Sequence, residues 1–302
     1  MWLQEIAGLL GKPLGKMDIT RFMDGELNIK IHDNVRGKDI FLIQPTCAPV
    51  NESLMEALLI LDAMKRASCN GVTLVMPYYG YARQDRKTQG RVPISASAVA
   101  LLIETMRPAR VVAMDLHCGQ IQGFFHHIPV DNLFADPLFL KVLEEYGLGP
   151  DSVIVSPDAG GVVRARNMAV KLHCDIAIID KERKVANECA SMQLIGDVRG
   201  KTVAIVDDMV DTAGTLCKAA ELLAASGAAK VFAVATHGVF SGPALDRMNA
   251  CEALEAVFVT NSIPQAERVQ KCPKLKEISV SAMLAEVIRR HADGESISML
   301  FN

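Results

Sequence analysis

VAIVDDMVDTAGT (residues 203–215) begins as an apolar run and ends in acids, hydroxyls and small residues. Its first four residues are typical of a buried strand, and helix periodicity starts near Thr215. Asp207 and Asp208 follow the apolar run, so we expect both carboxylates at the C-terminal edge of a sheet. The residues Asp211–Thr215 would then form the turn that opens a helix.

This turn has the chemistry of an anion site. Backbone N–H groups at a helix N-terminus have no partners inside the helix, and the helix dipole makes that end positive. Ala213 and Gly214 let a phosphate approach closely, while Thr212 carries a hydroxyl donor. A carboxylate pair would repel the phosphate, so its partners are expected to be sugar hydroxyls or a divalent cation. A helix cap rich in Asp is the better explanation of Asp211 alone, but it does not explain two adjacent acids at the end of an apolar strand. The stretch therefore predicts a phosphorylated-sugar site.

The order of β-rich run, polar loop and helix-period stretch recurs along the chain. Strands are expected at 39–44, 72–79, 110–116, 152–158, 175–180, 202–208, 230–238 and 255–262, and helices at 51–67, 95–106, 159–172, 215–226 and 281–290. This alternation predicts the α/β class, with mostly parallel sheets flanked by helices on both faces. A Pro, Asp and Gly-bearing region around 137–150 divides the chain, so we expect domains at 1–136 and 137–302.

Composition narrows the class of protein. The 302 residues are 50% hydrophobic and 22% charged, so the chain can bury a large core. A net charge of -3 offers no basic field for a nucleic-acid backbone. The eight cysteines are scattered singly, which gives little support to a zinc site or a redox dithiol. Because the N-terminus lacks a secretory signal and no apolar run reaches the ~20 residues of a membrane span, we expect a cytoplasmic protein without nucleic-acid or membrane partners.

Four segments together resemble one enzyme family. VAIVDDMVDTAGT resembles the phosphoribosyl-pyrophosphate loop that type I phosphoribosyltransferases share with ribose-phosphate diphosphokinases. PYYGYARQDRK (77–87), VVAMDLHCGQIQGFF (111–125) and SPDAGG (156–161) look like the diphosphokinases, and the likeness continues to GESISMLF (294–301). The resemblance implies two type I phosphoribosyltransferase-like domains, the first on the ATP side and the second on the ribose 5-phosphate side. The C-terminal tail is free to pack back on the first domain.

The resemblance also implies a reaction and its residues. The β,γ-diphosphoryl group of ATP would pass to the 1-hydroxyl of ribose 5-phosphate, giving phosphoribosyl pyrophosphate and AMP with Mg²⁺ as cofactor. The ribose 5-phosphate residues would be Asp207, Asp208, Asp211, Thr212, Ala213, Gly214 and Thr215. The catalytic residues would be Lys181 and Arg183 of KERKVANE, and ATP would be bound by Phe22, Asp24, Glu26, Arg83, Gln84 and His117. The metal ligands would be His117 and Asp158, with Asp115 and Asp131 as weaker candidates. Since Mg²⁺ prefers oxygen ligands, Asp158 is the stronger of the first two.

Family likeness further implies an assembly and its regulation. The segment 21–31 alternates apolar and polar residues like a strand or hairpin, and in the family it reaches the adenine site of a neighbouring subunit. A homo-oligomer is therefore expected, with a dimer as the minimum and a hexamer by resemblance. Inorganic phosphate and ADP are expected as effectors at the segments that contain Asp131, Asn132, Ser296, Ser298 and Phe301.

Two other functions stay open at this stage. A phosphoribosyltransferase would consume the same diphosphate with a nucleobase, but it does not explain YARQDRK (81–87). A non-catalytic regulatory subunit would keep the fold and modulate an active partner, and the intact KERK segment and Asp158 disfavour it. The chain also departs from the family at His126 and His127, where relatives commonly have one acidic residue, and at its beginning, where relatives usually have a strand.

Overall fold

The structure, a computed structural model, describes residues 2–182 and 191–301. It divides into two compact units, one formed by the chain up to Phe134 together with the chain from Ser279 onward, and the other by Ala135–Ile278. Sequence analysis placed the division after residue 136. Both units alternate parallel strands with helices, so the expected α/β class is confirmed. Within the described residues, no helix combines the length and the apolar character needed to cross a bilayer.

The first unit is built on a four-stranded parallel sheet. Its strands lie in the order β3 (Asp39–Ile43), β4 (Gly71–Met76), β5 (Arg110–Met114) and β6 (Val130–Leu133). The helices α2 (Val50–Arg66) and α3 (Ser95–Thr105) connect the first three strands, and the 3-10 helix η1 (Gly119–Phe124) follows β5. The apolar faces of α2 and α3 are buried against β4 and β5, and this packing forms the core of the unit.

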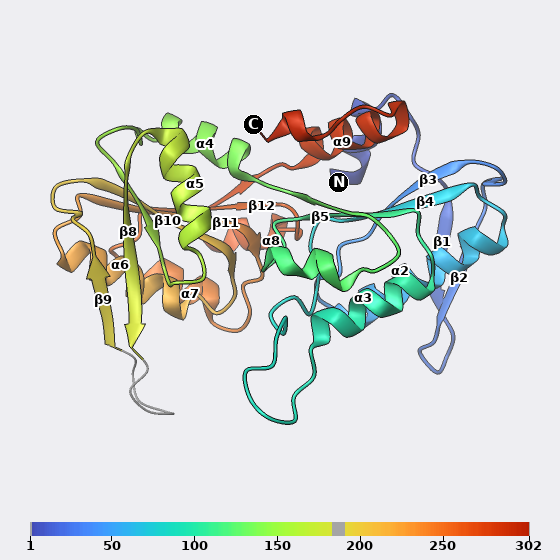
Figure 1. Ribbon diagram of the computed structural model, residues 1–302, viewed down its shortest axis with the longest axis horizontal. Coiled ribbons are helices and arrows are strands. Elements are labelled where there is room, and N and C mark those ends of the chain that lie inside the picture. The colour runs from blue at the N-terminus through green and yellow to red at the C-terminus, as the bar shows by residue number, and fades with distance from the viewer. Residues whose placement is uncertain (1, 183–190, 302) are drawn as a thin grey trace. The chain divides into compact units, whose positions relative to one another are not determined.

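Segments from both ends of the chain complete the first unit. The helix α1 (Trp2–Leu9) packs against α9 (Ser281–Asp293), as Figure 1 shows. β1 (Met17–Arg21) and β2 (Leu27–Ile31) form an antiparallel hairpin that lies beside α2 (Figure 1). The alternating segment 21–31 is therefore the turn and second strand of a hairpin.

The second unit contains a seven-stranded sheet in the order β13-β12-β11-β10-β7-β8-β9. Its strands are β7 (Val153–Ser156), β8 (Asp175–Glu182), β9 (Ser191–Ile195), β10 (Thr202–Val210), β11 (Lys230–Gly238), β12 (Ala256–Thr260) and β13 (Leu275–Ile278). All neighbours are parallel except β9, which runs antiparallel to β8 at one edge. Every strand predicted in this half of the chain is present.

Helices cover both faces of this sheet. They are α4 (Asp136–Glu145), α5 (Val162–Leu172), α6 (Gly214–Ala225), α7 (Ala244–Ala250) and α8 (Ala266–Lys271). The buried side chains of α6 and α7 form one core with alternate residues of the central strands. On the other face α5 packs against β7, β8 and β10, and Tyr146 after α4 stacks edge-on against Phe258 with ring centroids 4.8 Å apart. Burial on both faces explains why the strands read as near-continuous apolar runs.

The strand β10 extends further than the sequence predicted. It was expected to end at Asp208 but ends at Val210, because β11 pairs with it as far as Gly238. On its other side, β7 pairs with β10 only up to Ile205. Strands are added in opposite directions from β7 and from β10, so the edge between them is a topological switch point. Ligands of open α/β sheets bind at such points, beyond the carboxyl ends of the strands.

Candidate active site

The acid pair lies on β10 beside the switch point. Successive strand residues lie on opposite faces of a sheet, so Asp207 shares the face of Val203 and Ile205, which pack with α6. Asp208 lies on the face that α5 covers. The Asp208 side chain is buried, and its backbone N–H donates to Asp207 Oδ1 at 2.9 Å. Arg164 of α5 brings its Nη1 to 3.8 Å from Asp208 Oδ1.

The Asp207 carboxyl keeps its proton to a higher pH than an exposed aspartate does. Burial disfavours its charged form, and the negative charges of Asp208 and Asp158 add repulsion, so the pKa of Asp207 is raised well above its usual value. Two acids that interact this strongly titrate as a pair. A pair that retains one proton can both donate to and accept from hydroxyl groups, whereas two carboxylates can only accept.

The turn after β10 has a backbone suited to an anion. Ala213 has a φ of 57°, in the left-handed region, and α6 begins at the next residue, Gly214. The first N–H groups of α6 therefore lie directly after the acid pair, where the helix dipole is positive. Arg247 of α7 donates from Nη1 to the Thr212 carbonyl at 2.9 Å, and a Cβ atom on Gly214 would lie 3.5 Å from the same nitrogen. Arg247 thus holds the turn in place from the side of α7.

The loop after β11 braces the same turn. The Ser241 N–H donates to the Asp211 carbonyl at 3.0 Å. The loop is itself fixed at Gly238, whose carbonyl accepts Gln265 Nε2 at 2.7 Å and Arg268 Nη1 at 3.0 Å. Gln265 is buried, so its hydrogen bond is shielded from water. These contacts hold the turn 211–215 in place from the side of β11.

Asp158 lies in the loop between β7 and α5, on the other side of the switch point. Its Oδ1 accepts the N–H groups of Gly160 and Gly161 at 2.9 and 3.1 Å, and its carbonyl accepts the Ser156 hydroxyl at 2.7 Å. A Cβ atom on Gly161 would lie 2.9 Å from Ser156 Oγ, so a larger residue there would displace the serine hydroxyl from its hydrogen bond to the Asp158 carbonyl. Because the charge of Asp158 raises the pKa of Asp207, the two acids belong to one electrostatic site.

The residues Arg83 and Gln84 are exposed on the loop that follows β4 in the first unit. The Gln84 side chain accepts the Ser95 hydroxyl at the start of α3, which ties the loop to that helix. The beginning of the loop is fixed at Gly80, whose N–H donates to Thr46 Oγ1 at 2.7 Å. A Cβ atom at this glycine would lie 2.5 Å from the Thr46 carbonyl oxygen. The loop is therefore anchored at both ends.

The three other candidate metal ligands of the first unit have different surroundings. Asp115 is buried at the end of β5 with a φ of 41°, and His117 is exposed two residues later. Asp131 accepts Arg110 Nη1 at 2.5 Å and lies 3.3 Å from Nε2 of His291 on α9. In the part of the chain that the structure describes, no three His, Cys, Asp or Glu side chains gather closely enough to hold a metal ion.

The predicted subunit-contact residues lie in the turn between β1 and β2. Phe22 is 55% exposed, and the Asp24 carboxylate accepts the Glu26 N–H at 3.1 Å. Of the two predicted catalytic residues, Lys181 lies in β8, where it pairs with Met192 of β9. Arg183 lies outside the described residues.

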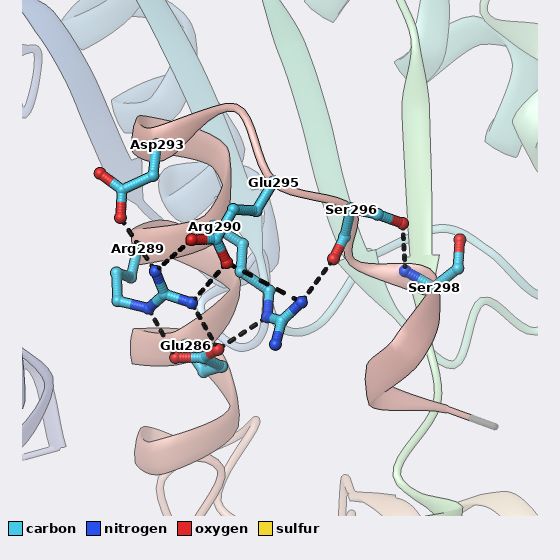
Figure 2. Close-up of polar contacts among 7 residues, drawn as sticks. All are labelled: Glu286, Arg289, Arg290, Asp293, Glu295, Ser296 and Ser298. Atoms are coloured by element: carbon cyan, nitrogen blue, oxygen red, sulfur yellow. Dashed lines mark hydrogen bonds and ion pairs between the residues drawn. The ribbon is translucent and has the colours of Figure 1, made fainter.

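The segment expected to bind effectors is held to the end of α9 by a charged network, which Figure 2 shows. Arg289 Nη2 donates to Glu295 at 2.7 Å, and Arg290 Nη1 donates to the Ser296 carbonyl at 2.7 Å. The Ser298 N–H, at the start of the 3-10 helix η2 (Ser298–Leu300), donates to Ser296 Oγ at 3.3 Å. Asp131, Asn132 and Phe301 belong to the same unit.

The structure brings one predicted set together at a single edge: Asp158, the acid pair and the turn 211–215, all in the second unit. The predicted ATP residues belong to the first unit. Sequence analysis missed Arg164 and Arg247. Arg164 comes three residues after SPDAGG, a spacing that could have placed it in the first turn of the next helix. Arg247 approaches the turn from a distant part of the chain, and no local pattern marks it.

Comparison with known proteins identifies the family. Residues 2–106 match the N-terminal domain of ribose phosphate pyrophosphokinase, and residues 184–302 match the phosphoribosyl synthetase-associated domain. A ribose-phosphate pyrophosphokinase of Burkholderia pseudomallei is 52% identical over 99% of this chain and 93% of its own length. The chain belongs to the ribose-phosphate pyrophosphokinase family. Ribose-phosphate pyrophosphokinase A of Dictyostelium discoideum is also 52% identical, with the same coverage of both chains.

A solved pyrophosphokinase structure supports the fold of the whole chain. Phosphoribosylpyrophosphate synthetase from Mycobacterium smegmatis has a TM-score of 0.91 and 40% sequence identity, covering 97% of this chain and 95% of the other. This likeness confirms the expected type I phosphoribosyltransferase-like fold. The chain is an enzyme, a ribose-phosphate pyrophosphokinase that produces phosphoribosyl pyrophosphate for nucleotide biosynthesis.

Proposed function

We propose that the 1-hydroxyl of ribose 5-phosphate attacks the β-phosphorus of ATP in line, and that AMP leaves as the bond to the β-phosphorus breaks. Asp207 and Asp208 bind the ribose hydroxyls, and the turn 211–215 binds the 5-phosphate. The observation that carries this assignment is the position of the acid pair and the left-handed turn at one topological switch point. No residue acts as a covalent nucleophile.

The chemical step requires charge neutralisation more than covalent help. We assign this role to Lys181 and Arg183, the two cations of KERKVANE. Arg83, Gln84 and His117 bind ATP within the subunit. Phe22, Asp24 and Glu26 bind the adenine of the ATP held by a neighbouring subunit. Their exposure on a hairpin turn supports this shared site, because exposed side chains can reach another subunit.

Magnesium is the proposed cofactor, and the acidic loop after β7 fits it. Asp158 offers hard oxygen ligands, and two backbone N–H groups orient its carboxylate. His117 is the second candidate, ahead of Asp115 and Asp131. A set of few protein ligands is typical of Mg²⁺, which keeps several waters and binds substrate phosphates. When bound, the ion supplies neutralisation of charge on the triphosphate.

The test is an AMP-release assay with purified protein, ATP, Mg²⁺ and ribose 5-phosphate. We expect AMP and phosphoribosyl pyrophosphate in equal amounts, and none when ribose 5-phosphate is left out. Activity only with a nucleobase and preformed phosphoribosyl pyrophosphate would contradict the proposal. So would an inactive protein that stimulates or inhibits another pyrophosphokinase, because that behaviour defines a regulatory subunit.

The working state proposed for the enzyme is a cytoplasmic homo-oligomer, at least a dimer and by family likeness a hexamer. Inorganic phosphate is the proposed activator and ADP the proposed inhibitor, acting near Asp131, Asn132, Ser296, Ser298 and Phe301. The network at the end of α9 supports this, because it fixes the backbone of Ser296 and Ser298 in one conformation. The AMP-release assay tests this regulation when the concentrations of phosphate and ADP are varied. Rates that do not depend on phosphate, together with ADP inhibition that is only competitive, would contradict the regulation.

A further inference from the structure

Arg164 of α5 is a charged residue to which the reaction above gives no role. Its side chain is only 20% exposed, and its Nη1 lies 3.8 Å from Oδ1 of Asp208, whose side chain is 7% exposed. A charge held this far from water is costly unless a group of opposite charge compensates it. The carboxylate on β10 is such a group.

The fold explains how these two residues meet. Asp208 lies on the face of β10 that α5 covers, whereas Asp207 lies on the face of α6. Arg164 is the third residue of α5, the helix that follows the loop of Asp158, and this position brings its side chain to Asp208 on β10. The charges of Asp158 and Asp208 both act on Asp207, so the three acids share one electrostatic site, and Arg164 lies beside Asp208 within it.

We propose that Arg164 is a positioning residue of the ribose 5-phosphate site, which holds the Asp208 carboxylate oriented toward the hydroxyls of the sugar. The inference rests on the proposed function, because that function puts the sugar hydroxyls at the acid pair. A guanidinium suits this role because its planar set of donors fixes the orientation of a carboxylate, which a point charge does less well. Asp207 completes the site as the partner that retains a proton.

The test compares Arg164→Gln with Arg166→Gln, which removes the same charge from an exposed position of the same helix. We expect Arg164→Gln to raise KM for ribose 5-phosphate by about tenfold, because Asp208 loses the charged partner that orients it. KM for ATP should stay within about twofold, because the change acts on one substrate. Arg166→Gln should leave both values unchanged.

A second variant separates positioning from packing. Arg164→Lys keeps the charge but not the planar fork, so its rise in KM should be smaller than that of Arg164→Gln. If Arg164→Gln does not fold, the KM of Arg164→Lys decides, and a value equal to that of the parent enzyme overturns the inference.

Two results overturn the inference while the proposed function stands. One is a parental KM for ribose 5-phosphate in Arg164→Gln. The other is an equal rise in KM for both substrates together with a lower melting temperature, which would make Arg164 structural. Asp208→Asn separates the role of Arg164 from the sugar site itself. An unchanged KM for ribose 5-phosphate in that variant would refute the sugar site.

Discussion

At the scale of single residues, the acid pair is kept at a cost in stability. Desolvation and like charges raise the pKa of Asp207, so its charged form disfavours the folded state. Residues with such perturbed pKa values concentrate at functional sites, where buried and like-charged groups serve binding or catalysis although they do not favour folding. If the acid pair binds the sugar as proposed, Asp207 gives up stability for that binding.

The variant Asp207→Asn should be more stable than the parent and bind the sugar less well. The folded protein keeps the Asp207 proton to a higher pH than the unfolded chain does. The free energy of unfolding of the parent therefore falls as the pH rises from the ordinary aspartate pKa to the raised pKa of Asp207. Asparagine removes that dependence. Thermal unfolding at about pH 5 and about pH 9 measures it, and we expect the variant to gain ~2–4 °C or more at the higher pH, the shift that ~1 kcal/mol produces.

The same variant should raise KM for ribose 5-phosphate by about tenfold, since a hydrogen bond from a charged or protonated acid is lost. Glu221→Gln, on the exposed surface of α6, serves as the control. If Asp207→Asn left both KM and the pH dependence of unfolding unchanged, Asp207 would neither bind the sugar nor hold its proton in the folded protein.

At the scale of elements, loops are fixed at their ends by close backbone contacts. Gly80 begins the loop that carries Arg83 and Gln84, and it lies against the backbone of Thr46. Asp211 is similarly held by the loop after β11. Positioning of substrate residues on loops depends on such anchors, because the loops themselves pack few side chains.

Gly80→Ala should lower stability and weaken ATP binding together. The added Cβ atom would lie 2.5 Å from a backbone oxygen, so the loop must shift, at a cost of about 1–3 kcal/mol of unfolding free energy. Gly90→Ala is the matched control, because nothing lies within 4 Å of a Cβ atom at that exposed glycine. Chemical denaturation and KM for ATP measure the effect. Equal behaviour of the two variants would show that the anchor is unimportant.

Arg247→Gln should weaken binding of the sugar phosphate without abolishing it. The variant loses a charged donor to the Thr212 carbonyl, so the turn before α6 is held less firmly. We expect KM for ribose 5-phosphate to rise by about three- to tenfold, with KM for ATP unchanged. Lys230→Gln, which removes a charge at the opposite end of β11, should have no effect. If KM for ATP rose more than KM for ribose 5-phosphate, Arg247 would not act by holding the turn before α6.

At the scale of the whole molecule, each proposed active site contains residues from two subunits. The turn with Phe22 and Asp24 is exposed, and the hydrogen bonds that hold it lie within the hairpin itself. A shared site would explain why these residues are kept on the surface. It also makes activity depend on assembly.

Mixing two inactive variants tests this distribution. Asp24→Ala removes the part contributed to the neighbour, and Lys181→Ala removes the part that stays in the subunit. If subunits reassort at random in a dimer, half of the dimers are mixed and each has one intact site, so about a quarter of the parental activity should return. Native mass spectrometry of the mixture verifies reassortment. No recovery in mixed oligomers would place both residues in the same subunit's site.

Much of the site was predictable because its signal is local. The run from Val203 to Thr215 contains a strand, an acid pair and a turn in the order that the sheet edge requires, and the structure places them there. The end of β10 was misjudged, because its last two residues pair with β11, which local propensity does not report. Arg164 and Arg247 were missed since each reaches the site from another helix.

The amino-acid sequence by itself determined the α/β class, the alternation of the central strands with helices, and the chemistry at the ends of those strands, but it did not predict β6, β9, β13 or the helices α4, α7 and α8. Hydrophobic periodicity and turn residues express these properties within short windows of chain. Tertiary structure alone decided the strand order in the sheet, the switch point between β7 and β10, and the pairing of Asp208 with Arg164. These depend on contacts between residues far apart in sequence, where burial and charge compensation, rather than local propensity, select the partners.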